Sequence, residues 1–364
     1  MLPPRAPAAH AEQGAHPDAA VRSTDSDALV SRASAAALGY FADPFSSLFL
    51  SPQQRRTLDR RPPLIHIGTH ARTWAVDSLV ARFLDPNVGP HHPVQVLSLG
   101  AGTDTRFWRL RKQWADAGKD WNCARWVEVD FPEATTAKAR TVSTKPDLRS
   151  ALGGDVKIEQ GGLALSSPLY TLLPGDLRSL SALSESLLSP STSPTFGAPL
   201  SPSLPTLLLV ECVLVYLEPA ATDALLSWFA LTWGADGGAG GAIVEYDPFG
   251  LEDQFGAVMR RNLAVRSISL PGAASTPSLA SLTERLRRAG VRGETGALSV
   301  RQIRDRCIDA DEVERVARIE QLDEVEELNL VLEHYAVAWG NLRASSEEEG
   351  QGEDKEGIRL EERR

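Results

Sequence analysis

Apolar residues of this chain gather into short runs, and most of these runs are separated by stretches with helical periodicity. Five runs have the composition of buried strands: 94–100 (VQVLSLG), 126–130 (WVEVD), 206–216 (TLLLVECVLVY), 241–247 (GAIVEYD) and 334–340 (HYAVAWG). Strands that alternate with helices require crossover connections, which produce a mostly parallel sheet with helices on both faces. The pattern therefore predicts an α/β fold.

Three stretches do not have the periodicity of a folded core. Residues 1–20 are small and contain proline, and residues 344–364 form a charged run, so we expect both ends to be disordered. A Ser/Pro-rich stretch at about 184–205 precedes the strand at 206 and predicts a surface insertion. The 42% hydrophobic content could fill one large core or two modest ones, and a single elaborated domain over residues 21–343 fits best.

A glycine-rich turn follows the first of these strands. Gly100 and Gly102 come where that strand ends, and Asp130 ends the next strand. Glycines let the backbone approach a ligand closely, and an acid at the tip of the next strand can accept both hydroxyls of a ribose. A Gly-x-Gly alone is equally consistent with a plain tight turn, but the spacing to Asp130 favours a nucleoside site.

The residues after the turn argue against a dinucleotide. The dinucleotide motif has a third glycine where this chain has Thr105, and the neighbouring Asp104 would repel a pyrophosphate. S-adenosylmethionine has no phosphate, and its positive sulfonium and ammonium groups favour a nearby carboxylate. We therefore interpret the turn as part of a site for S-adenosylmethionine.

The segment before the first strand has a helical pattern. This pattern extends over residues 24–84 and includes an amphipathic stretch that begins near Arg72. In a parallel α/β sheet, ligands collect at the carboxyl ends of the strands. We expect the N-terminal helical portion to cap the cofactor there.

Two further acids follow or interrupt strand-like runs. Asp176 comes after LYTLLPG, and Glu211 lies inside the run at 206–216. An ionised group is costly to bury without a partner, so Glu211 indicates either a functional contact or a satisfying arginine. Asp176 is also a good helix N-cap candidate, and so is Asp130, because a proline follows it two residues later.

Charge and composition exclude several classes of function. The net charge of −10 gives no electrostatic reason to bind nucleic acid or an anionic membrane. No apolar run reaches the length of a membrane span, and the N-terminus does not have the apolar core of a signal peptide. Cys123, Cys212 and Cys307 have no metal-site spacing, so we expect buried thiols and no metal. These features predict a soluble protein of the cytoplasm, and of the nucleus as a further location.

Taken in order, several segments resemble the leucine carboxyl methyltransferases. They are 71–80 (ARTWAVDSLV), 99–110 (LGAGTDTRFWRL), 127–133 (VEVDFPE), 175–180 (GDLRSL), 207–219 (LLLVECVLVYLEP) and 244–263 (VEYDPFGLEDQFGAVMRRNL). The likeness covers roughly residues 21–340. The blocks around the glycine turn and Glu211 are far more specific than a lone glycine loop.

This resemblance implies a fold and an activity. Such enzymes have the Rossmann-like fold of class I S-adenosylmethionine-dependent methyltransferases. They methyl-esterify the C-terminal leucine of the catalytic subunit of type 2A protein phosphatases. We accordingly expect that subunit as the partner, S-adenosylmethionine as the co-substrate, and a monomeric enzyme.

The resemblance also implies roles for particular residues. Seven residues match the family's contacts with the cofactor. Gly100 and Gly102 match contacts with the methionine part, Asp130 with the ribose, and Asp176 and Leu177 with the adenine. Glu211 matches a further cofactor contact, and Arg72 matches the contact with the cofactor carboxylate. On the acceptor side, Arg72 also matches the arginine that contacts the substrate end. Tyr216 could donate its hydroxyl to the substrate carboxylate, or could simply be a packing residue.

Arg32 stands where the family commonly has lysine. The substitution keeps the charge but replaces a flexible point charge with a planar fork. Arg32 and Arg72 could also be ordinary surface arginines, since most arginines are exposed.

Other functions share part of this pattern. A related branch acts in tRNA wybutosine modification and carries a propeller of repeats of about 50 residues, which this sequence does not contain. A small-molecule O-methyltransferase would have the same cofactor half of the site. A non-catalytic protein that docks on the phosphatase is a further alternative.

Overall fold

The computed structural model describes residues 17–193, 195–234, 238–343 and 357–363. Within this part of the chain, nine strands form one sheet in the order β3-β4-β5-β2-β1-β6-β7-β9-β8. Their bounds are β1 (Val94–Leu99), β2 (Cys123–Asp130), β3 (Lys157–Glu159), β4 (Ala164–Ser166), β5 (Tyr170–Pro174), β6 (Thr206–Glu211), β7 (Gly241–Pro248), β8 (Thr295–Ser299) and β9 (Tyr335–Leu342).

The central strands of the sheet are parallel. β5, β2, β1, β6 and β7 pair with one another in parallel. The edge strands are antiparallel: β3 pairs with β4 and β4 with β5 on one side, and β7 pairs with β9 and β9 with β8 on the other. All six residues of β1 are buried, as expected for a strand covered on both faces. The predicted class I methyltransferase fold, with a mostly parallel sheet, is confirmed.

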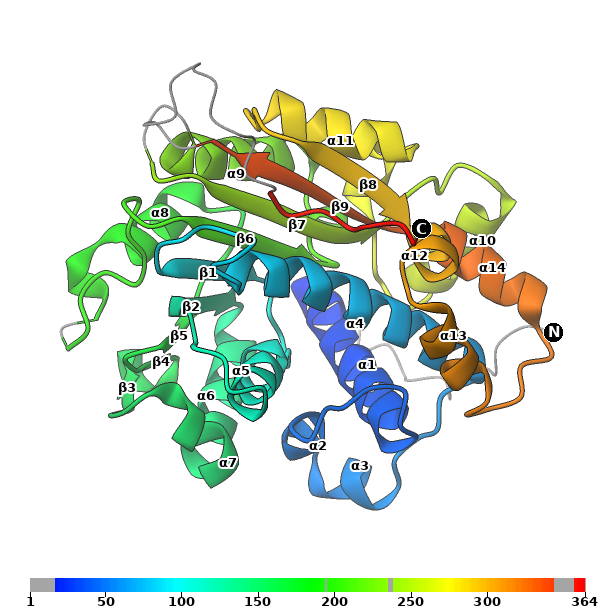
Figure 1. Ribbon diagram of the computed structural model, residues 1–364, viewed down its shortest axis with the longest axis horizontal. Helices are drawn as coiled ribbons and strands as arrows, with labels where there is room; N and C mark the ends of the chain where they lie inside the picture. Colours follow the sequence, from blue (N-terminus) through cyan, green and yellow to red (C-terminus); the bar gives the residue numbers. More distant parts are fainter. Residues whose placement is uncertain (1–16, 194, 235–237, 344–356, 364) are drawn as a thin grey trace.

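Helices cover both faces of the sheet. Figure 1 shows α8 (Leu180–Leu188), α9 (Pro219–Trp233) and α11 (Leu279–Arg288) above it, and α4 (Pro63–Leu84), α5 (Arg106–Asp116) and α6 (Pro132–Thr144) below it. β1 contributes side chains to both layers. Val94 and Val96 belong to the hydrophobic core between the sheet and α4, and Leu97 and Leu99 belong to the core between the sheet and α9. Alternation along one buried strand therefore joins the two cores.

The remaining helices lie around the ends of this sandwich. α1 (Pro17–Ala37), α2 (Ser46–Phe49) and α3 (Pro52–Arg56) precede α4, and α7 (Pro146–Arg149) follows α6. α10 (Gln254–Ala264), α12 (Val300–Arg306), α13 (Ala310–Ala317) and α14 (Val325–Glu333) lie toward the right-hand end of the view in Figure 1. No helix in the described ranges is long and apolar enough to cross a membrane.

The strand predicted at 206–216 is shorter than expected. β6 ends at Glu211, because Cys212 adopts φ +56° and its N–H donates to the carbonyl oxygen of Tyr246 (2.6 Å). A 3₁₀ turn, η4 (Leu214–Tyr216), follows. The prediction was wrong for residues 212–216, and the early turn moves Tyr216 out of the sheet toward the carboxyl ends of the strands.

The predicted surface insertion and the predicted disordered C-terminal run are both partly folded. In the Ser/Pro-rich stretch, residues 184–188 complete α8, and Leu187 and Leu200 are buried. In the C-terminal segment, residues 357–363 pack on the domain: the Ile358 N–H donates to Asn341 Oδ1 (2.9 Å), and Ile358 and Leu360 are buried.

The disorder expected over residues 344–364 is therefore wrong for 357–363, because apolar side chains at 358 and 360 anchor them. At the other end, residues 17–20 begin α1, so the expectation of disorder over residues 1–20 fails for these four. Residues 1–16, 344–356 and 364 lie outside the described part of the chain.

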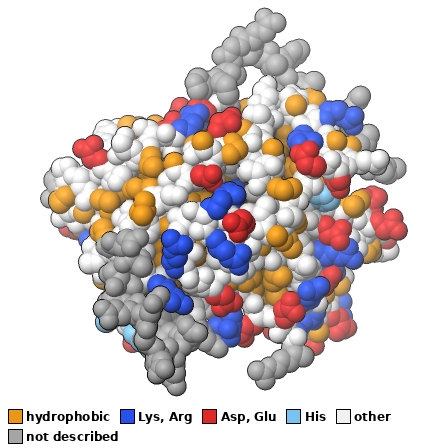
Figure 2. Space-filling view, turned by 90° about the horizontal axis from the view of Figure 1, so that it is seen from above, with side chains coloured by type: hydrophobic (Ala, Val, Ile, Leu, Met, Phe, Trp, Pro, Cys, Tyr) orange, Lys and Arg blue, Asp and Glu red, His pale blue; other side chains and the backbone are white. Residues whose placement is uncertain are grey.

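Charged side chains of both signs share the surface. On the face seen from above in Figure 2, acidic and basic residues are interspersed with scattered hydrophobic ones.

Candidate active site

A cavity of about 620 Å³ lies at the carboxyl ends of the parallel strands. Its wall is built by α1, α4, the turn after β1, and the residues that end or follow β2, β5 and β6. All nine residues predicted for the site line it: Arg32, Arg72, Gly100, Gly102, Asp130, Asp176, Leu177, Glu211 and Tyr216. The structure thus brings together residues that are up to 184 positions apart in the sequence (Arg32 to Tyr216).

The N-terminal helix forms one wall of the cavity. Nine residues of α1, from Asp18 to Arg32, line it. α1 is held to the glycine turn by Asp25, whose Oδ1 accepts hydrogen bonds from the Thr103 N–H (2.8 Å) and hydroxyl (2.7 Å). The segment predicted to cap the site therefore does lie over it.

The glycine turn requires its glycines for two reasons. Gly100 and Gly102 adopt φ +64° and +45°, which L side chains rarely adopt. A Cβ at Gly100 would lie 2.5 Å from Val213 Cγ2, and one at Gly102 would lie 2.3 Å from Asp25 Oδ1. Both the backbone conformation and the close approach of neighbouring segments therefore exclude a side chain.

Asp130 is held at the cavity wall by backbone donors. Its Oδ2 accepts from the Gly102 N–H and its Oδ1 from the Phe131 N–H, each at 2.6 Å. Burial raises the pKa of Asp130, and these two hydrogen bonds oppose that rise. Phe131, and not Asp130, is the N-cap residue of α6, so the predicted N-cap alternative is not what the structure has. Each oxygen keeps a lone pair that could accept from a ligand hydroxyl.

Asp176 makes a local turn on the rim. Its Oδ1 accepts from the Arg178 N–H (2.9 Å), and the Arg178 guanidinium also bonds to Asp18 on α1. α8 begins later, with Ser179 at its N-cap, so Asp176 is not that cap. Hydrogen bonds from Arg178 lower the pKa of Asp176, which keeps the carboxylate ionised as an acceptor.

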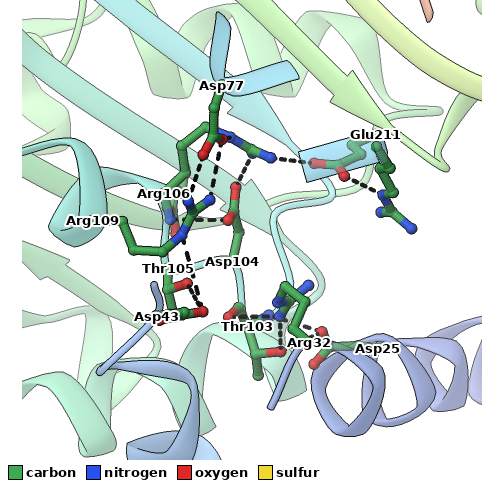
Figure 3. A network of polar contacts seen from close by, with 12 residues as sticks. Asp25, Arg32, Asp43, Asp77, Thr103, Asp104, Thr105, Arg106, Arg109 and Glu211 are labelled. Carbon is green, nitrogen blue, oxygen red and sulfur yellow. Dashed lines mark hydrogen bonds and ion pairs between the residues drawn. The ribbon is translucent and has the colours of Figure 1, made fainter. Parts of the chain in front are cut away.

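Glu211 joins two arginines at the base of the cavity. Its Oε1 accepts from Arg72 Nε and its Oε2 from Arg106 Nη2 (3.1 Å), as Figure 3 shows for Arg106. Burial would raise the pKa of Glu211, but the two arginines outweigh burial and hold the pKa well below its usual range. Glu211 should therefore stay ionised below the pH at which ordinary carboxyl groups titrate.

Sequence reasoning missed Arg106. Its side chain is 3% exposed, and it bonds to Asp77 (Nε to Oδ1, 2.7 Å), Asp104 and Glu211 (Figure 3). Four charged groups from α4, the glycine turn, α5 and β6 thus meet at one point. The signal available in the sequence was Asp104 and Arg106 two residues apart beside the glycine turn, but their shared partners lie on other elements.

Arg32 binds the glycine turn. Its Nη2 donates to the carbonyl oxygen and to the hydroxyl of Thr103, both at 2.8 Å (Figure 3). Together with Asp25 it fixes α1 across the turn. Both bonds come from one nitrogen, so this contact does not use the two-nitrogen fork by which a guanidinium differs from a lysine ammonium.

Three tyrosines line the cavity beside Arg72. The Arg72 guanidinium lies 4.5 Å from the centre of the Tyr246 ring, and Tyr246 stacks on Tyr335 (5.5 Å, 14°). Burial raises the pKa of Tyr216, so its hydroxyl stays protonated and can donate. Among the described residues, Nη1 and Nη2 of Arg72 have no hydrogen-bond partner, so they are available to an anion in the cavity.

Asp247 near the end of β7 makes folding stability depend on pH. Its side chain is 3% exposed, and burial raises its pKa to about 8, although Arg285 opposes the rise. The unfolded chain loses this proton near pH 4. Between about pH 4 and 8 the folded state therefore binds more protons, so stability should fall as pH rises through this window.

Asp247→Asn should remove this dependence, because the amide replaces the protonated acid without a charge. Thermal melts from pH 5 to 9 should show the melting temperature of the wild type falling by several degrees relative to the variant. Parallel curves would contradict the assignment of a buried neutral acid.

Metal ligands do not cluster in the described part of the chain: it contains no group of three or more His, Cys, Asp or Glu residues placed to hold an ion. Burial raises the pKa of the Cys212 thiol, the cysteine that lines the cavity, to about 12. That thiol is therefore protonated and weakly reactive at neutral pH.

The chain is similar to proteins of one family. The family model described as "Leucine carboxyl methyltransferase" matches residues 20–230. "Leucine carboxyl methyltransferase 1" of Cryptococcus neoformans (strain JEC21) is 42% identical over 93% of this chain and 97% of its own length. The protein of that name from Aspergillus fumigatus is 40% identical (93% and 87%), and that from Bos taurus is 32% identical (90% and 91%).

Proposed function

This chain belongs to the leucine carboxyl methyltransferase family, and we propose that it methylates the α-carboxylate of the C-terminal leucine of a type 2A protein phosphatase catalytic subunit. The observation that carries the proposal is Arg72. Its guanidinium lies in the cavity on Glu211 and on the Tyr246 ring, with two nitrogens available to an anion. A terminal carboxylate is an anion that fits such a fork.

The cavity has the features required for S-adenosylmethionine. Glycines with left-handed backbone allow close approach at the turn after β1, and Asp130 offers acceptors for ribose hydroxyls. Glu211 provides the negative charge for an ammonium group. Bound there, S-adenosylmethionine would supply an electrophilic methyl group on a positively charged sulfur.

Little acid–base chemistry is needed from the protein. An α-carboxyl group has an ordinary pKa of about 3.3 to 3.7, so the acceptor is already ionised at pH 7. No general base has to remove a proton. The protein has to align one carboxylate oxygen and to exclude the water that solvates it.

Arg72 is placed to do the aligning. Glu211 and the Tyr246 ring hold its guanidinium, so one carboxylate oxygen could be bound while the other stays free to react. α1 covers the cavity and limits entry of water. Because the ester product is neutral, its bond to Arg72 should be weaker than that of the carboxylate, which favours release.

The decisive experiment supplies labelled S-adenosylmethionine together with the phosphatase catalytic subunit, either intact or without its last leucine. We expect one base-labile methyl group on the C-terminal peptide of the intact subunit, and none on the truncated subunit. Equal labelling of both would contradict the proposal.

The same assay separates the alternatives. Label in a metabolite extract but not in the subunit would favour a small-molecule O-methyltransferase, and label in tRNA would favour the wybutosine branch. Stable association with the subunit without any transfer would favour a docking protein. Each of these outcomes would overturn the proposed acceptor.

A further inference from the structure

Gly68 occupies an unusual place for a glycine. It lies in the interior of α4, where glycine is destabilising relative to alanine. Its backbone is helical, so no left-handed conformation requires it. Packing does not require it either: a Cβ there would have one neighbour within 4 Å, Leu332 Cδ2 at an ordinary contact distance of 3.5 Å.

Gly68 forms part of the wall of the cavity. Gly68 lines it together with other residues of α4, α12, α14 and β9: Leu64, Ile65, Val300, Val331, Leu332 and Tyr335. These side chains are apolar or aromatic, whereas the cofactor half of the cavity contains Asp130, Asp176 and Glu211. The end of the cavity under Gly68 therefore suits an apolar group.

This apolar end lies next to the anion-binding group. Gly68 is four residues before Arg72, so the two share one face of α4, separated by a rise of about 6 Å. Long side chains on a helix lean toward its N-terminus, which brings the Arg72 side chain toward Gly68. In an amino acid, an aliphatic side chain extends roughly 4 to 5 Å from the carboxyl carbon. A residue whose carboxylate binds Arg72 could therefore place its own side chain over Gly68.

We propose that Gly68, facing Leu332, sets the size of the terminal side chain that the enzyme accepts. A Cβ at Gly68 would already lie in van der Waals contact with Leu332 Cδ2 (3.5 Å), so a methyl group added there would narrow the cavity beside this contact and leave less room for a branched aliphatic group. This inference rests on the proposed function, because it assigns the side-chain subsite of the same acceptor. Gly68 is thus a specificity residue and not a catalytic one.

The test compares Gly68→Ala with the wild type on phosphatase catalytic subunits that end in leucine or in alanine. One added methyl group in the subsite should lower kcat/KM for the leucine-ended subunit by roughly 10-fold or more. For the alanine-ended subunit the change should be less than about threefold, because that side chain leaves room for the methyl group. Direct binding of each subunit, without cofactor, should show the same preference.

Ser78→Ala is the matched control. Ser78 lies ten residues along α4, does not line the cavity, and donates only to the Trp74 carbonyl oxygen (2.7 Å). Its replacement should leave the preference unchanged. Gly68→Ala should also melt at or above the wild-type temperature, because alanine favours the helix and its Cβ meets no clash.

The outcomes separate the two proposals. If the wild type methylates the leucine-ended subunit and Gly68→Ala loses both acceptors equally, or neither, the side-chain subsite is wrong while the proposed function stands. If the wild type methylates no subunit, the proposed function fails, and the assignment of Gly68 fails with it.

Discussion

Arg72→Ala should lower kcat/KM for methyl transfer by about a thousandfold. A charge-assisted hydrogen bond to the acceptor contributes roughly 1.5 to 3 kcal/mol. Loss of alignment adds about 10²-fold, since small misplacements of the reacting atoms are costly. A radiolabelled methyl assay with the phosphatase subunit measures the effect.

The fold should survive the loss of Arg72. Its partner Glu211 would still be paired with Arg106, so no carboxylate is left buried without a counter-charge. Arg72→Lys is the matched control: it keeps the charge but not the fork, and should retain more activity than alanine while remaining at least tenfold below the wild type. Near-normal turnover of Arg72→Ala, in protein with an unchanged melting temperature, would rule out this role.

Glu211→Gln should weaken binding of S-adenosylmethionine by about 100-fold, because a charge-assisted bond to the ligand ammonium is lost. The substitution also removes the counter-charge shared by Arg72 and Arg106. Isothermal calorimetry with S-adenosylmethionine and S-adenosylhomocysteine gives both dissociation constants.

A second ligand makes this test specific. 5′-Methylthioadenosine has the same nucleoside but no ammonium or carboxylate, so its affinity should be nearly equal for the wild type and Glu211→Gln. Equal weakening of all three ligands would indicate general damage to the cavity and not loss of an ammonium contact. Arginines hold the pKa of Glu211 well below its usual range, so in the wild type this contact should persist until the pH falls below that of ordinary carboxyl titration.

Spacing along the chain was enough to predict that Gly100, Gly102 and Asp130 lie close together in one cavity. Gly100, Gly102 and Asp130 belong to two consecutive strands, and parallel strands bring their carboxyl ends together. Glu211 was recognisable because a single acid interrupts an apolar run. Gly100, Gly102 and Glu211 could be found from their immediate neighbours in the sequence, and Asp130 from its position at the end of the next strand.

Other features depended on segments that meet only in the folded chain. Arg106 positions three carboxylates, because it forms ion pairs with Asp77, Asp104 and Glu211. No local sequence pattern predicts that these residues come together. The end of β6 at Glu211 was missed because Cys212 adopts a left-handed backbone conformation (φ +56°) that turns the chain out of the sheet, and nothing in the apolar run predicts it. The packing of residues 357–363 likewise depends on Asn341 of β9.

Hydrophobic periodicity, turn glycines and isolated acids thus predicted the α/β class, the parallel centre of the sheet and a group of residues that line one cavity. The attachment of α1 to Thr103 through Asp25 and Arg32, and the position of Gly68 in the cavity wall beside Leu332, were decided by the tertiary structure. The physical reason is the distance along the sequence over which each kind of interaction acts. Backbone geometry and burial patterns act between near neighbours in the sequence, whereas ion pairs and cavity volume depend on which distant side chains packing brings together.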